Sequence, residues 1–179
     1  ITTAMEEHLS THLRTGQDVQ TLTRFLNAML LRRAEKDGWT PWRWQERQID
    51  AMLTDPSWFY RSFTIPKKSG GLRHIDAPKR TLKLVQWALV PLFSEMFTPS
   101  SQVYGFVKGR GIVDNASVHL GQSAVLNVDI QGFFPSVSRA RIEAILKDGP
   151  VLRLSEYMAR SIARLCTLHG GLPQGSPAS

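Results

Sequence analysis

The stretch "WFYRSFTIPKKSGGLRHIDAP", residues 58–78, contains two runs rich in aromatic and β-branched residues, separated by a segment with two glycines. Aromatic and β-branched residues favour strands, and glycines allow the tight turn that joins two antiparallel strands. The stretch therefore predicts a β-hairpin with "KKSGG", residues 67–71, at its tip. The segments on both sides have helical periodicity, so we expect an α+β fold.

Apolar residues recur at helical spacing before the hairpin. Asp18 is typical of the start of a helix, and Gly38 is typical of its end. Thr40 followed by Pro41 predicts the start of a second helix, which we expect to run to about Leu53. Both helices are expected to serve packing rather than chemistry.

The sequence after the hairpin predicts four more helices and one strand. These are a helix over about 80–97, a helix over about 112–120, a strand over 124–129, a helix that begins at Ser136 or Ser138 and is ended by 148–150, and a helix that begins at Ser155 and reaches about His169. The tail "GGLPQGSPAS" has no apolar element after it, so we expect the chain to be a fragment of a longer protein.

The composition is that of a globular, basic protein. The 179 residues are 42% hydrophobic, which is enough for a core. No apolar run approaches the roughly 18 to 20 residues of a membrane span, and the N-terminus lacks the pattern of a signal peptide, so we expect a cytoplasmic location without membrane contact. The single cysteine, Cys166, excludes an internal disulfide and is expected in the core. The formal charge of +7 favours a polyanionic partner.

A basic segment coincides with the predicted hairpin. It contains one acid, Asp76, and seven basic residues: Arg61, Lys67, Lys68, Arg73, Lys79, Arg80 and Lys83. Such a run is compatible with a solvated face and with a phosphate-binding surface. The position of Lys67, Lys68 and Arg73 at or near the hairpin tip favours phosphate binding, because a hairpin tip can close over a phosphate chain.

Asp129 ends the apolar run "AVLNVD". A carboxylate at the end of a buried strand is costly unless it is hydrogen-bonded, paired or bound to a cation. Two interpretations remain open: Asp129 caps the following turn, or it is a ligand of Mg²⁺, which prefers carboxylates together with substrate phosphates. Consecutive strand residues face opposite ways, so we expect one of Phe133 and Phe134 in the core and the other facing the space above Asp129.

The loop "GLPQGSP", residues 171–177, is rich in glycine and proline. Gln174 carries both a hydrogen-bond donor and an acceptor, and Gly175 permits close approach of a ligand to the backbone. The sequence alone predicts a tight loop, and its place after Asp129 makes it a candidate part of the same site.

In this order, several stretches resemble the front half of a bacterial reverse transcriptase over about residues 59–179. They are "FTIPKKSGGLRHIDAP", "LKLVQWALVPLF", "YGFVKGRGIVDNASVH", "VLNVDIQGFFPS" and "GLPQGSPAS". The motif "NASVH", residues 115–119, is similar to the Asn-Ala-x-x-His signature of retron reverse transcriptases, and group II intron enzymes are the nearest alternative. Without this resemblance, His119 would be interpreted as a core histidine.

The resemblance implies the fingers and partial palm of a right-hand polymerase fold, incomplete at the C-terminus. Together with the helical pattern before the hairpin, it divides the chain into an N-terminal helical region over 1–56, fingers over 57–121, and a partial palm with intervening helices over 122–179. The two further catalytic aspartates of the family, in a Tyr-x-Asp-Asp hairpin, are expected beyond residue 179.

The resemblance also implies roles for individual residues. Asp129 matches a catalytic metal ligand, assisted by the backbone carbonyl of Ile130. Phe134 matches the aromatic residue beneath the sugar of the incoming nucleotide. The remaining nucleotide-binding residues are expected to be Lys67, Lys68, Arg73 and Gln174, and the contacts to template or RNA are expected to be Gly175, Lys79, Arg80, Asn115 and His119.

The function that the resemblance implies is RNA-directed DNA synthesis. The partners would be an RNA template, a DNA primer and a deoxynucleoside triphosphate, and the cofactor would be two Mg²⁺ ions, which stabilise the attacking and leaving oxygens of phosphoryl transfer. A retron enzyme would copy a structured noncoding RNA and take part in antiviral defence. A group II intron-type enzyme and a non-catalytic RNA-binding module are the alternatives.

Overall fold

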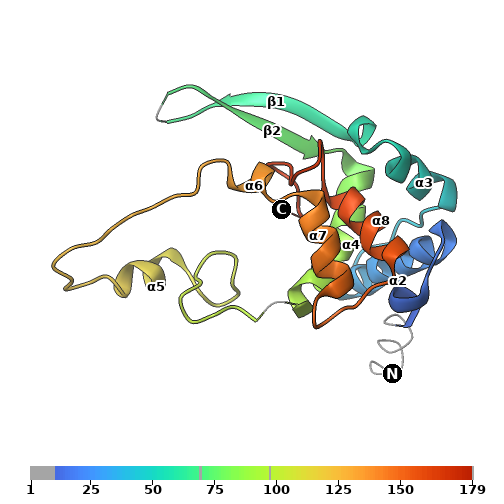
Figure 1. Cartoon of the computed structure of the whole chain (residues 1–179), viewed down its shortest axis with the longest axis horizontal. Coiled ribbons are helices and arrows are strands. Elements are labelled where there is room, and N and C mark those ends of the chain that lie inside the picture. Colours follow the sequence, from blue (N-terminus) through green and yellow to red (C-terminus); the bar gives the residue numbers. More distant parts are fainter. Residues whose placement is uncertain (1–10, 69, 97, 179) are drawn as a thin grey trace.

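Helices supply most of the hydrophobic core in the computed structural model, which describes residues 11–68, 70–96 and 98–178. Along the chain the elements are α2 (Val19–Asp37), α3 (Glu46–Thr54), the 3-10 helix η1 (Pro56–Phe59), β1 (Tyr60–Pro66), β2 (Leu72–Pro78), α4 (Arg80–Met96), α5 (Ile112–Ser117), α6 (Phe133–Ser136), α7 (Arg139–Asp148) and α8 (Glu156–Cys166). Figure 1 shows α2, α3, α4, α7 and α8 packed together, with the β1–β2 hairpin and the segment that carries α5 projecting on one side.

The first helix has the predicted bounds. The Asp18 carboxylate accepts a hydrogen bond from the Thr21 amide at 2.7 Å and so caps the N-terminus of α2. Gly38, with φ of 74°, donates its amide to the Ala34 carbonyl and ends the helix in the left-handed conformation that suits glycine.

The prediction that Thr40 and Pro41 begin a second helix is wrong. Residues 40–45 are not helical, and α3 begins only at Glu46. The reason is a contact with α2: the Asn27 side chain accepts from the Trp44 amide at 2.8 Å and donates to the Trp44 carbonyl at 3.0 Å. The Trp44 backbone is hydrogen-bonded to Asn27, and the Trp44 indole is buried. Residues 40–45 are therefore held against α2 and do not form a helix of their own.

The long helix α4 supplies the centre of the core. Its apolar residues Leu82, Val85 and Leu89 are fully buried, as the helical pattern predicts. The facing helix α8 is capped by Ser155, and Ser138 rather than Ser136 caps α7. No helix in the described part of the chain is long and apolar enough to cross a membrane.

The hairpin is confirmed. Its strands pair antiparallel from Tyr60 opposite Pro78 to Pro66 opposite Leu72. At the tip the Lys67 amide donates to the Gly71 carbonyl at 3.0 Å, and the Gly70 amide donates to the Lys67 carbonyl at 3.1 Å. Tyr60 is buried while the rest of β1 is exposed, so the hairpin is anchored at its base.

The predicted strand over 124–129 does not form. This segment has no regular structure, all of 111–130 is exposed, and Val128 is 80% exposed. A strand needs a hydrogen-bonded neighbour, and within the described residues β1 and β2 pair only with each other. Nearby, α5 ends at Ser117, three residues before the predicted end at 120.

The last helix, α8, is also shorter than predicted. It ends at Cys166, and Leu168 and Gly171 then exchange backbone hydrogen bonds at 2.9 and 3.1 Å. His169 and Gly170, with φ of 51° and 84°, form the turn between them. Because two consecutive residues with positive φ cannot belong to a right-handed helix, α8 cannot extend to His169 as predicted.

Cys166 is buried in the core as predicted, and burial raises the pKa of its thiol to about 12. We predict that iodoacetamide leaves the native chain unmodified at about pH 8, because the reactive thiolate is neither formed nor accessible. After unfolding in urea, Cys166 should be alkylated completely, as measured by intact-mass spectrometry. Rapid alkylation without denaturant would contradict the burial of Cys166.

Candidate nucleotide-binding cleft

A cleft of about 620 Å³ lies between the hairpin, the segment around α6 and the loop after α8. We call it the nucleotide cleft, after the nucleotide-binding role that the resemblance predicts for several of its lining residues. The hairpin contributes Lys67 and 72–74 with Asp76, the segment around α6 contributes 129–135, and the C-terminal loop contributes 168–169 and 171–174. Three parts of the chain that are far apart in the sequence therefore form one concave surface.

Most of the residues that the resemblance implies for metal and nucleotide binding line this cleft. Those that do are Lys67, Arg73, Asp129, Ile130, Phe134 and Gln174. Lys68, at the hairpin tip, does not line it. The cleft thus brings two cations from the hairpin to the same space as a carboxylate, an aromatic ring and an amide, while their roles remain predictions.

The loop after α8 is fixed by backbone contacts. The Asp76 amide donates to the Gln174 carbonyl at 3.0 Å, so the loop lies along β2. Gly175 has φ of 111°, and a Cβ atom there would come within 3.0 Å of the Ile75 side chain. At Gly171, a Cβ would lie 2.6 Å from the Pro135 carbonyl oxygen. Glycine is required at both positions, because any side chain would push the loop away from β2 and from α6.

A buried amide connects this loop to the core. Gln86 on α4 is fully buried; its Nε2 donates to the Tyr60 hydroxyl at 2.8 Å and to the Leu165 carbonyl at 2.9 Å. Its Oε1 accepts from the Ser176 hydroxyl at 2.7 Å. One side chain therefore joins α4, the base of the hairpin, the end of α8 and the loop that carries Gln174. Burial also raises the pKa of the Tyr60 hydroxyl, which stays protonated.

Asp76 is a second acid in the cleft, and sequence reasoning gave it no role. Its carboxylate accepts from the Ser62 hydroxyl at 2.5 Å, lies 3.1 Å from His74 Nε2, and is 15% exposed. Ser62 is directly opposite Asp76 in the hairpin. One sequence signal could have indicated the contact between His74 and Asp76. The two residues are two positions apart on a predicted strand, which places both side chains on one face of β2.

Asp129 is exposed, which differs from the buried strand end expected for it. Its carboxylate and the Ile130 carbonyl are oxygen ligands of the kind that Mg²⁺ prefers. Among the described residues, no group of three or more His, Cys, Asp or Glu side chains gathers where a metal ion could bind. The donors fit Mg²⁺ in chemical type but supply only part of a coordination shell.

The expectation that one of Phe133 and Phe134 is a core residue is wrong. Both lie on the short helix α6 rather than on a strand, so they do not alternate between two faces. Their rings are 5.7 Å apart in an edge-to-face arrangement, and both line the nucleotide cleft. Phe134 is partly buried and Phe133 is 49% exposed.

The residues expected to contact template or RNA lie elsewhere. Gly175 packs against β2 at the edge of the loop, and Lys79 donates its ammonium group to the Trp58 carbonyl at 2.6 Å. Asn115 lies on α5, and His119 follows in the adjoining turn, both exposed. Arg80 lines a different cleft. The nucleotide cleft therefore gathers most of the residues predicted for the metal and the nucleotide and none of those predicted for the template.

Comparison with known proteins gives the same family as the motifs. No known protein-family profile matches the chain. The chain is 44% identical over 87 residues to the retron Mx65 reverse transcriptase of Myxococcus xanthus. This match covers 49% of this chain and 20% of that protein. It is 30% identical over 123 residues to the retron Ec86 reverse transcriptase of Escherichia coli. That match covers 67% of this chain and 37% of the Ec86 enzyme. The chain is related to the retron reverse transcriptases.

The predicted resemblance to retron reverse transcriptases is thus confirmed, and it extends to a further relative. The retron Mx162 reverse transcriptase of Myxococcus xanthus is 39% identical over 95 residues, or 53% of this chain and 20% of that protein. The matched part therefore spans from 20% to 37% of the length of these retron reverse transcriptases.

We predict that Ser176→Ala loosens the loop without unfolding the core, because it removes the hydroxyl that binds Gln86. Hydrogen exchange at the Asp76 amide, which bonds the Gln174 carbonyl, should become faster. Gln86→Leu should in addition lower the free energy of unfolding by about 1 to 3 kcal/mol, because it leaves buried polar groups without partners. Urea titration measures this loss.

Ser94→Ala is the matched control. Ser94 lies on α4, the helix that carries Gln86. Its exposed hydroxyl donates to the Val90 carbonyl at 3.0 Å. That variant should change neither exchange at Asp76 nor stability. Unchanged exchange in Ser176→Ala would show that the bond between Ser176 and Gln86 does not hold the loop.

Proposed function

We propose that this chain supplies the fingers and part of the palm of a retron-type RNA-directed DNA polymerase, which extends a DNA primer on an RNA template. The observation that carries the proposal is the nucleotide cleft, where Lys67 and Arg73 of the hairpin share one space with Asp129 and Phe134. The retron reverse transcriptases to which the chain is related support the RNA template, and the formal charge of +7 is compatible with a nucleic-acid partner.

The cations of the hairpin are proposed to hold the triphosphate of the incoming deoxynucleotide. Arg73 offers a planar fork of donors that suits phosphate oxygens, and Lys67 adds a mobile positive charge. Both would offset the negative charge that develops on the departing pyrophosphate. A backbone hydrogen bond joins β2 to the loop that carries Gln174. Arg73 at the triphosphate and Gln174 against the rest of the nucleotide would therefore be held in a fixed relative position.

Asp129, with the Ile130 carbonyl, is proposed to hold Mg²⁺. When bound, two such ions stabilise the attacking and leaving oxygens of phosphoryl transfer. The exposed position of Asp129 leaves its carboxylate accessible for this role, whereas the Asp76 carboxylate is already hydrogen-bonded to Ser62. The further carboxylates of the site are proposed to come from the rest of the polymerase.

Phe134 is proposed to lie beneath the sugar and to exclude a 2′-hydroxyl, and Gln174 to lie against the nucleotide. The position of both in the cleft supports these roles. At a finer level, we propose that the polymerase copies a structured noncoding RNA of its own retron, and that it acts in antiviral defence.

The first test of the proposal is Asp129→Asn in the complete polymerase. Primer extension should fall to background, because the neutral amide is a poor Mg²⁺ ligand, while RNA binding should stay unchanged. Asp148→Asn, at the exposed end of α7, is the control and should keep full activity. Near-normal synthesis by Asp129→Asn would remove Asp129 from the catalytic site.

The second test compares Phe134→Ala with Phe133→Ala in the same enzyme. We expect Phe134→Ala to lower the ratio of kcat/KM for deoxyribonucleotides over ribonucleotides by about tenfold or more, because space for the 2′-hydroxyl opens. Neither ring is fully buried, so each stability loss should stay below the roughly 3 to 5 kcal/mol of a core phenylalanine. A changed ratio in Phe133→Ala alone would assign the sugar contact to Phe133.

A further inference from the structure

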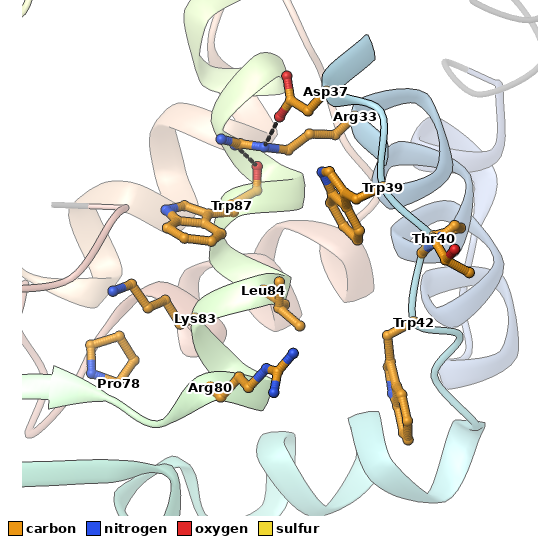
Figure 2. A pocket seen from close by; sticks show the side chains of 11 residues that line it. Arg33, Asp37, Trp39, Thr40, Trp42, Pro78, Arg80, Lys83, Leu84 and Trp87 are labelled. Atoms are coloured by element: carbon orange, nitrogen blue, oxygen red, sulfur yellow. Dashed lines mark hydrogen bonds and ion pairs between the residues drawn. The ribbon is translucent and has the colours of Figure 1, made fainter. Parts of the chain in front are cut away.

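A second cleft, of about 1110 Å³, lies between the end of α2, the segment 39–42 and the first turns of α4. None of its lining residues lines the nucleotide cleft. Figure 2 shows Trp87, Leu84 and Arg80 on α4, with Trp39 and Trp42 on the neighbouring segment. We call this surface the tryptophan cleft.

Three indole rings dominate the tryptophan cleft. Trp42 is 54% exposed, and Trp39 and Trp87 are partly buried. An exposed tryptophan leaves a large apolar face in water, which favours a ligand with a flat apolar face of its own. The cleft is large enough for more than one such ring system, because ordinary ligand pockets measure roughly 300 to 1,000 Å³.

The charge of the tryptophan cleft is positive. Lys83 Nζ lies 5.2 Å from the centre of the Trp87 ring, and the Arg33 guanidinium lies 5.1 Å from the same ring. Arg33 is partly neutralised by Asp37, at 3.4 Å, and also donates to the Trp87 carbonyl at 3.3 Å (Figure 2). Asp37 is the only acid among the lining residues.

Arg80 is the cation most available to a ligand. It is exposed, and its guanidinium has no hydrogen bond or ion pair to any other described residue. In Figure 2 it extends from the start of α4 into the space on the side of Trp42. An available guanidinium close to an exposed indole matches a ligand that alternates flat rings with negative charges.

The segment that carries Trp39 and Trp42 is fixed before any ligand binds. At one end, directly after Gly38, the Trp39 amide donates to the Ala34 carbonyl of α2 at 3.1 Å. At the other end Asn27 bonds the backbone amide and carbonyl of Trp44. A site held at both ends loses little conformational entropy on binding.

We propose that the tryptophan cleft binds an unpaired stretch of nucleic acid, separately from the nucleotide cleft. Bases of a single strand stack on indole rings, and the phosphates between them are neutralised by basic side chains. A duplex keeps its base faces stacked internally and cannot use Trp42 in this way. The cations favour such a polyanion over an apolar peptide.

The test uses the 179-residue chain and a fluorescently labelled single strand of about ten nucleotides, within the roughly 4 to 16 nucleotides of known single-strand sites. Trp42→Ala should weaken binding about tenfold or more, for RNA and DNA alike, because stacking does not require the 2′-hydroxyl. Fluorescence anisotropy measures the affinity, and the melting temperature should be unchanged because Trp42 is exposed.

Trp58→Ala is the matched control. Trp58 is 74% exposed on η1 and lines neither cleft, so its removal should leave binding unchanged. Arg80→Gln should reduce the slope of log affinity against log salt by about one. A blunt RNA duplex of the same length should bind without any effect of Trp42→Ala.

Three results would overturn the proposal. Unchanged single-strand affinity in Trp42→Ala would assign the cleft to another partner, such as a protein. Equal losses in Trp42→Ala and Trp58→Ala would indicate nonspecific contact with exposed indoles. A loss for RNA alone would require recognition of the 2′-hydroxyl instead of stacking. None of these readouts depends on polymerase activity.

Discussion

The fully buried Gln86 amide is the interaction on which the arrangement of the other parts depends. A primary amide carries two donor hydrogens and one acceptor oxygen, and each must find a partner once water is excluded. Here the partners come from β1, from the end of α8 and from the loop after α8. These elements cannot shift independently, because moving one of them would leave a buried polar group unsatisfied.

This constraint explains how a small chain can form a cleft from distant segments. Tyr60 anchors the base of the hairpin to Gln86, and Ser176 anchors the loop to the same side chain. The backbone bond between Asp76 and Gln174 then closes the contact between hairpin and loop. The hairpin tip, with Lys67, extends away from this node and is exposed. In the cleft, β2 and the loop are thus held together by hydrogen bonds, whereas the hairpin tip extends into solvent.

Features set by local chemistry could be predicted from the sequence. The caps Asp18, Ser138 and Ser155 and the hairpin turn follow from short-range preferences, and the structure contains them. Predictions that depend on distant partners failed. The second helix begins at Glu46 instead of at Thr40, because Trp44 is hydrogen-bonded to Asn27, 17 positions away in the chain. The strand expected over 124–129 lacks a neighbour in the described chain.

The candidate site was predictable to a similar degree. Family motifs pointed to residues that do meet in one cleft, such as Arg73 and Asp129. Periodicity could not place Phe133, because the two phenylalanines lie on a helical turn. It also gave no indication of the hydrogen bond between Ser62 and Asp76 or of the tryptophan cleft. Both depend on pairs of segments that are brought together only by the hairpin register and by the packing of α2 against α4.

The exposed run over 124–130 has a consequence for handling the chain in solution. Leu126 and Val128 are 87% and 80% exposed, and their backbone is not paired in a sheet. Short apolar, β-prone segments with unpaired backbone tend to add to one another edge to edge and to seed aggregates. Asp129 is the only charge in this run, and a charge beside such a segment opposes the stacking of identical chains. The carboxylate that is proposed to bind magnesium would therefore also oppose the association of neighbouring copies of the chain.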